Sequence, residues 1–149
     1  MTDLGRSRRW PAYVMAALFL EYAVAKAVRA GQGRLGIPGG PPVPAAVTAR
    51  YPVDPALAQS IACATGLVAA AVALATVTAL GRRIPRLLML GALAVLVVAV
   101  GAGAATMSLD AFVGLGIGWR WYQGVGGLLS LALSLEMVRS YLVATRRAR

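Results

Sequence analysis

A largely apolar stretch at residues 10–30 constrains the fold of this chain more than any other feature. Hydrocarbon offers no partner for backbone N–H and C=O groups, so a segment that crosses a bilayer must form a helix of about 20 residues. The stretch has that length and follows three basic residues, Arg6, Arg8 and Arg9. Its first residue, Trp10, suits a membrane entrance because aromatic rings favour the interface. The stretch therefore predicts a membrane-spanning helix.

Three further apolar stretches follow, at about residues 56–80, 87–107 and 121–143. The 149-residue chain is 59% hydrophobic and 13% charged, with a mean hydropathy of +0.72, which is outside the range of soluble globular proteins. These patterns predict an all-α integral membrane protein, a single domain that forms a four-helix bundle. Residues 111–120 are too few to cross and include three glycines, so we expect an interfacial or re-entrant connection there.

Small residues recur at every fourth position in the second and fourth spans. Such stripes let two helices approach closely in a membrane, where no water-driven force holds them together. We therefore expect both stripes to lie at helix–helix contacts. The stripes are Ala62, Gly66 and Ala70 in the second span, and Gly126, Ser130 and Ser134 in the fourth.

The distribution of basic residues predicts the orientation of the spans, because cytoplasmic loops carry an excess of Lys and Arg. With both termini in the cytoplasm, ten basic residues fall inside and five outside. The inner set is Arg6, Arg8, Arg9, Arg82, Arg83, Arg86, Arg139, Arg146, Arg147 and Arg149, and the outer set is Lys26, Arg29, Arg34, Arg50 and Arg120. Both termini are predicted to be cytoplasmic. Because these clusters explain the net charge of +10, no nucleic-acid partner is predicted.

The first external loop, residues 31–55, is rich in glycine and proline and cannot form one continuous helix. Its GQGRLG segment has the spacing of a dinucleotide-binding fingerprint. That motif works only between a strand and a helix, and here prolines follow it, so nucleotide binding is not predicted. The loop is either a flexible cap over the bundle or a contact for a partner or lipid headgroups through Arg34, Arg50 and Tyr51.

Glu21 is the acidic residue nearest the middle of a predicted span, about 16 Å along the helix from Trp10. A carboxylate at that depth costs about 2.5–3.5 kcal/mol on insertion scales, so it should be protonated, paired or turned toward the bundle interior. Lys26 lies about 140° around the helix from it and is poorly placed to pair. Glu21 is thus a candidate proton or cation site, or a protonated carboxyl hydrogen-bonded to a neighbouring helix.

Glu136 is predicted to lie nearer the membrane boundary, about 8 Å from the inner side. Arg139 follows it at a spacing that brings two side chains together on a helix. This spacing predicts an interfacial ion pair of structural character. Glu136 and Glu21 differ in depth and so do not form the carboxylate dyad that acid–base chemistry uses.

The sequence contains no histidine and a single cysteine, Cys63. This composition excludes His-ligated haem, the usual zinc arrangements, His-based catalytic triads and an intrachain disulfide. We predict no catalytic residue, no cofactor, no metal site and no enzymatic activity. Fourteen of the 15 basic residues are arginine, and Ala, Gly and Val are abundant, which indicates a GC-rich bacterial genome. The expected location is the bacterial cytoplasmic (inner) membrane.

Two resemblances come from residues already described. The four spans and a first loop containing LGIPGGP resemble small actinobacterial membrane proteins that share a domain of unknown function. The segment FLEYAVAKAVRAGQG, residues 19–33, is similar to the first helix of small multidrug resistance transporters. That second resemblance implies a proton-coupling role for Glu21 and a substrate cavity lined by aromatic residues such as Tyr22. The first loop here is far longer than in that family, and the glutamate and lysine are closer together.

Together these features predict a small polytopic membrane protein with a non-enzymatic structural or interaction role. Its expected partners are the lipid bilayer and either further copies of itself or a larger membrane complex. The alternative is a proton-coupled transporter of small molecules or cations that uses Glu21.

Overall fold

The computed structural model describes residues 8–147, apart from the side chains of Arg82 and Arg147. Every regular element within those residues is helical. The elements are α1 (Trp10–Gly31), α2 (Ala45–Ala49), α3 (Pro55–Ala75), the 3₁₀ helix η2 (Leu80–Arg83), α4 (Arg86–Val113) and α5 (Trp121–Arg147). Of these, α1, α3, α4 and α5 are long and apolar enough to cross a membrane. The prediction of an all-α chain with four candidate spans is confirmed. Arg6 and Arg149 of the predicted inner set lie outside the described residues.

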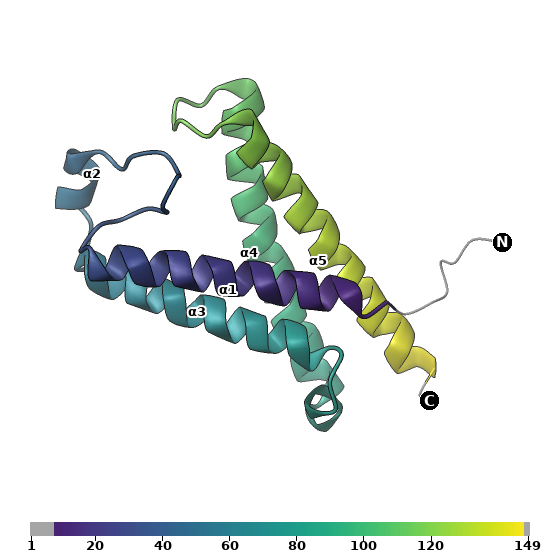
Figure 1. Cartoon of the computed structure of the whole chain (residues 1–149). Coiled ribbons are helices and arrows are strands. Elements are labelled where there is room, and N and C mark those ends of the chain that lie inside the picture. The colour runs from purple at the N-terminus through teal and green to yellow at the C-terminus, as the bar shows by residue number, and fades with distance from the viewer. Residues whose placement is uncertain (1–7, 148–149) are drawn as a thin grey trace.

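The four long helices pack as two antiparallel pairs, α1 with α3 and α4 with α5 (Figure 1). The pairs contact each other mainly through α1 and α5, with a smaller contact between α3 and α4. They meet where α1 begins and α5 approaches its end, and they spread apart toward the opposite end. We call the joined end, which includes the turn around Arg83, the basic end, and the opposite end the loop end. The arrangement is therefore two helical hairpins joined at one end.

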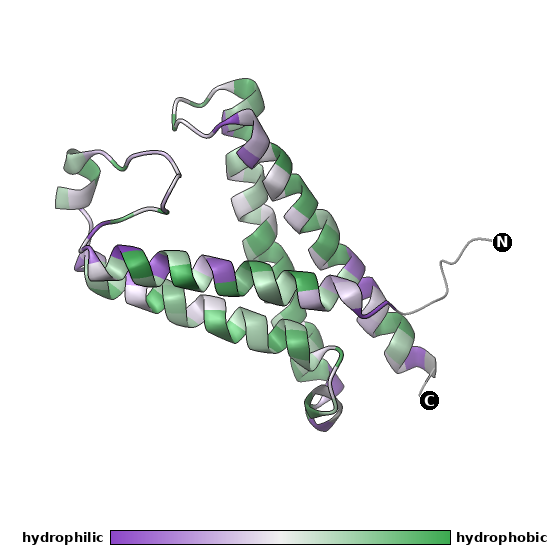
Figure 2. Cartoon of the chain, viewed as in Figure 1, coloured by the Kyte–Doolittle hydropathy of each residue, from purple (hydrophilic) through white to green (hydrophobic). Residues whose placement is uncertain are grey.

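The buried core lies at the basic end and draws on all four long helices. Met15 of α1, Ala73 of α3, Leu93 of α4 and Met137 of α5 are each at most 1% exposed. Elsewhere many large apolar side chains are exposed on the outside of the helices. Figure 2 shows that hydrophobic residues, in green, predominate along the four long helices. Such a surface is favourable in hydrocarbon and unfavourable in water. The distribution of apolar side chains thus agrees with a protein that crosses a membrane.

Close approach of α1 and α3 depends on the small-residue stripe in α3. A Cβ atom placed on Gly66 would lie 2.9 Å from Tyr22 Cδ1 and 3.1 Å from the Cβ of Ala23. Ala70 is buried one turn later, and Ala62 is half-buried one turn earlier. The predicted stripe therefore does face a neighbouring helix.

The stripe predicted in α5 is wrong for its first member. Gly126 faces open space, whereas its neighbour Gly127 would place a Cβ atom 3.0 Å from Ala104 Cα. Gly124 lies equally close to α4, with 2.8 Å from its added Cβ to that of Ala111. The residues that contact α4 are therefore spaced by three and four positions, which averages close to the 3.6 residues of one helical turn. Residues at a constant spacing of four lie progressively further around the helix and leave the contact face.

Two helix ends differ from the predicted spans. α3 ends at Ala75, before the predicted limit near residue 80, and the chain turns so tightly that a Cβ on Gly81 would collide with the Ala75 carbonyl. α4 continues to Val113, beyond the predicted limit near residue 107. It ends where Gly114 adopts a left-handed conformation, with φ of 83°. The connection between α4 and α5 is consequently shorter than predicted.

Candidate functional site

Glu21 lies on the outward face of α1. It shares this face with four other exposed residues, Tyr13, Ala17, Val24 and Val28, at helical steps of three and four. Within the described part of the chain, Glu21 makes no hydrogen bond or ion pair. The carboxyl group is thus neither paired nor turned toward another helix of this chain, contrary to two of the three expected arrangements.

Lys26 and Arg29, near the end of α1, bind backbone carbonyls of the first loop. Lys26 Nζ donates to the carbonyl of Gly36 at 3.1 Å, and Arg29 Nη2 donates to that of Ile37 at 3.3 Å. The Lys26 ammonium also lies 5.4 Å from the centre of the Tyr22 ring, a distance that allows a cation–π contact. Lys26 therefore positions the loop, and its charge is directed away from Glu21.

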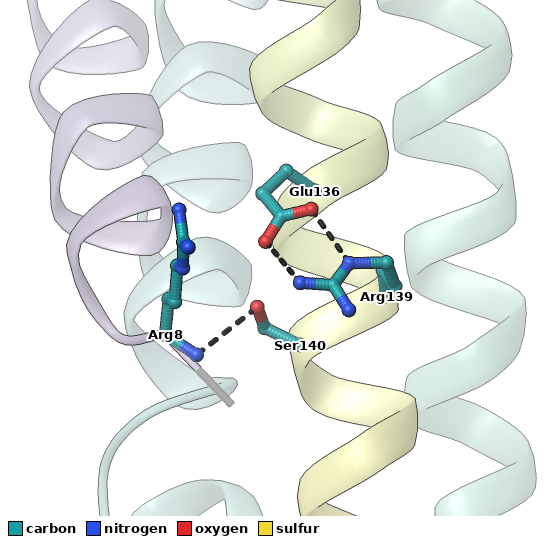
Figure 3. A network of polar contacts seen from close by, with 4 residues as sticks. All are labelled: Arg8, Glu136, Arg139 and Ser140. Atoms are coloured by element: carbon teal, nitrogen blue, oxygen red, sulfur yellow. Dashed lines mark hydrogen bonds and ion pairs between the residues drawn. The ribbon is translucent and has the colours of Figure 1, made fainter. Parts of the chain in front are cut away.

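Glu136 and Arg139 form a two-point ion pair on α5 (Figure 3). Arg139 Nε donates to Glu136 Oε2 at 2.7 Å and Arg139 Nη2 to Oε1 at 2.6 Å. Beside the pair, the backbone N–H of Arg8 donates to Ser140 Oγ at 3.2 Å. This bond ties the chain segment before α1 to α5. Both oxygens of Glu136 accept from Arg139, a residue of the same helix, so the pair stabilises α5 locally.

Asp110 is a buried carboxylate whose role the sequence did not reveal. It is 6% exposed and accepts three backbone N–H bonds, from Ile117 at 2.9 Å, Gly118 at 2.8 Å and Trp119 at 2.6 Å. Gly114, Gly116 and Gly118 have positive φ angles, which let successive N–H groups turn toward one point. In the sequence, this arrangement is indicated only by the glycines at alternate positions that follow Asp110. Asp110 thus fixes the connection between α4 and α5.

A cavity of about 830 Å³ opens at the basic end, between the start of α1, the turn after α3, the start of α4 and the end of α5. Arginine side chains from three of these segments line it: Arg8, Arg9, Arg83 and Arg86. Glu21 is not among the lining residues. In the sequence these arginines indicate only the membrane orientation, because their convergence depends on how the helices pair.

Across residues 8–147, no group of three or more Cys, Asp or Glu side chains could hold a metal ion. Cys63 is a half-buried free thiol on α3.

Comparison with known proteins returned no match: no family model, curated protein or solved structure is similar to this chain. The two resemblances described from the sequence therefore stay predictions. What the structure establishes is an all-helical chain with four candidate membrane spans, joined as two hairpins.

Proposed function

We propose that this protein is a non-enzymatic structural or interaction subunit of a bacterial cytoplasmic membrane, and that α1 packs against another transmembrane helix through the face that carries Glu21. The observation that carries the proposal is an exposed, unpartnered carboxyl group within a candidate span of the described chain. In hydrocarbon such a group costs about 2.5–3.5 kcal/mol, so a helix that donates a hydrogen bond to Glu21 would stabilise the complex.

The residues around Glu21 favour helix packing. Ala17 lies one turn before it and leaves room for a second backbone to approach. Val24 and Val28 extend the same face with apolar side chains, and Val24 is 64% exposed. The partner is either a second copy of this chain or another subunit of a larger membrane complex.

The proposed orientation has both termini in the cytoplasm. Its support is the excess of arginine at the basic end, where α1 begins, α4 begins and α5 ends. The loop of residues 31–55 then lies on the outer side, together with the connection between α4 and α5.

Proton-coupled transport through Glu21 is the alternative function. It requires a water-accessible path to the carboxyl group, and the cavity at the basic end is not lined by Glu21. The interaction role therefore has the stronger support. Gradient-driven cation uptake by wild-type proteoliposomes that is lost in Glu21→Gln would reverse this preference.

Disulfide cross-linking in native membranes tests the interaction role. In a Cys63→Ala background, Ala17→Cys and Val24→Cys place one thiol on either side of Glu21. The matched control is Val68→Cys on α3, which is 63% exposed and lies near the depth of Glu21 because Gly66 packs against Ala23. We expect oxidised adducts of the two α1 variants, and little adduct of the control.

The mass of the adduct identifies the partner as a second copy or another protein. A Glu21→Gln change should preserve cross-linking because an amide still forms hydrogen bonds. Glu21→Leu should reduce cross-linking about fivefold to thirtyfold, as expected for the loss of a hydrogen bond worth about 1–2 kcal/mol in a membrane. Equal cross-linking at all three positions, or none at any, would contradict the proposal.

A further inference from the structure

The cavity at the basic end carries a concentrated positive charge. Four arginines line it, and no acidic residue of the described chain does so. Glu136 is the nearest acidic residue along α5, one position before the lining residue Met137, and Arg139 already binds both of its oxygens. Arg8 lies within electrostatic reach of Glu136 but forms no ion pair with it. Among the described residues, the cavity therefore has no acidic side chain to balance these charges.

Arg86 adds an unsatisfied donor. Its Nε atom is buried and has no hydrogen-bond partner among residues 8–147. A buried N–H group without an acceptor is unfavourable, and more so when it belongs to a charged guanidinium. An oxygen acceptor would satisfy it, and an anionic one would form the strongest bond because the guanidinium is charged.

The backbone at this position also favours an anion. α4 begins at Arg86, and its N-cap, Pro85, provides no side-chain acceptor for the first-turn N–H groups. These N–H groups and the helix dipole place partial positive charge at the edge of the cavity. They add to the charge of Arg83 and Arg86 at the same place.

We infer that this cavity binds an anionic phosphate group, carried either by a membrane phospholipid or by a soluble phosphate compound. Guanidinium groups match the oxygens of phosphate in pairs, and several arginines can share one phosphate. The volume lies within the range of about 300–1,000 Å³ that is usual for small-molecule sites. Apolar lining residues such as Val77, Ile84 and Met137 suit the acyl chains that a phospholipid carries beside its phosphate.

The position of the cavity favours the lipid headgroup as the source. It lies where α1 and α4 begin and where α3 and α5 end, which is the level of the membrane boundary for all four candidate spans. Basic pockets between helices on the cytoplasmic side are typical sites for anionic headgroups. The inference uses neither Glu21 nor the exposed face of α1, so it stands independently of the proposed interaction role.

The test uses the purified full-length protein, stripped of lipid and returned to nanodiscs with phosphatidylglycerol or phosphatidylcholine. Native mass spectrometry counts the retained lipids. The double variant Arg83→Gln/Arg86→Gln removes two cavity charges, and Arg34→Gln/Arg50→Gln removes two exposed charges from the first loop as the control. We expect a preference for phosphatidylglycerol that falls about tenfold to thirtyfold in the cavity variant only.

A second arm uses inorganic phosphate on the lipid-free protein in detergent. If phosphate raises the melting temperature of the wild type but not of the cavity variant, while phosphatidylglycerol shows no preference, the ligand is a soluble phosphate. If only phosphatidylglycerol binds selectively, the ligand is a lipid headgroup. If the cavity variant fails to fold, the two wild-type measurements decide. Absence of both effects, or equal loss in the loop control, overturns the inference.

Discussion

Asp110 organises the connection between α4 and α5 through contacts that its sequence position alone does not reveal. The spacing of Glu136 and Arg139 is local, so helix geometry suffices to anticipate their contact. The bonds of Asp110 to Ile117, Gly118 and Trp119 depend instead on the path of the intervening loop. That path follows from three positive φ angles, which a glycine permits but does not require. The sequence shows where Asp110 lies along the chain, but only the structure shows which backbone N–H groups it binds.

Replacement of Asp110 by alanine should release residues 117–119. The change leaves three backbone N–H groups without their carboxylate acceptor, and a hydrogen bond to a charged group contributes about 1.5–3 kcal/mol. We expect faster hydrogen exchange at these three amides and a lower melting temperature. In the control, Asp54→Ala removes the α3 N-cap, whose side chain accepts from the N–H of Leu57 at 3.0 Å, and should cost about 1 kcal/mol. Unchanged exchange at residues 117–119 in Asp110→Ala would refute this role.

The helices themselves were largely predictable, because hydropathy identifies a segment that crosses a membrane. Their ends and contact faces were less so. The end of α4 is set by the left-handed conformation of Gly114, and the end of α3 by the close turn at Gly81. Neither feature changes the average hydropathy of the segment. The choice between Gly126 and Gly127 as the contact residue depends on where α4 lies.

Alanine substitutions at these adjacent glycines of α5 should have opposite effects. Gly127→Ala places a methyl group against the backbone of Ala104 and should lower the free energy of unfolding by about 1–3 kcal/mol. Gly126→Ala meets open space and should raise the stability by up to about 1 kcal/mol, because alanine favours helix more than glycine does. Thermal unfolding in detergent measures both. Equal effects of the two variants would show that α5 does not pack against α4 through the face that carries Gly127.

The predicted membrane orientation places opposite ends of the protein on opposite sides of the bilayer. In a Cys63→Ala background, Arg50→Cys and Arg83→Cys introduce single thiols at exposed positions in the first loop and at the basic end. A thiol reagent that cannot cross membranes should label Arg50→Cys in intact cells, and Arg83→Cys only after permeabilisation. The reverse labelling pattern would show that the predicted orientation is wrong, and it would not contradict the fold.

The pairing of the four helices could not be derived from their sequences. Each long helix is apolar on most of its surface, so its hydropathy does not distinguish the side that contacts lipid from the side that contacts protein. The convergence of Arg8, Arg9, Arg83 and Arg86 on one cavity follows from that pairing. The sequence shows that these residues are basic, but it does not show that they line the same cavity.

The two hairpins contact each other mainly at the basic end. A small rotation there produces a larger displacement at the loop end. α4 contains 28 residues and is therefore about 42 Å long, so a rotation of about 5° at the joint displaces its far extremity by about 4 Å. At that extremity the amide of Gln123 donates one bond, at 3.2 Å, to the carbonyl of Gly39. A single such bond contributes only about 0.5–1.5 kcal/mol, and Gly40 packs against Trp119 and Gly118 against Pro41 beside it. These contacts between the first loop and the connection between α4 and α5 therefore limit how far the two hairpins can spread.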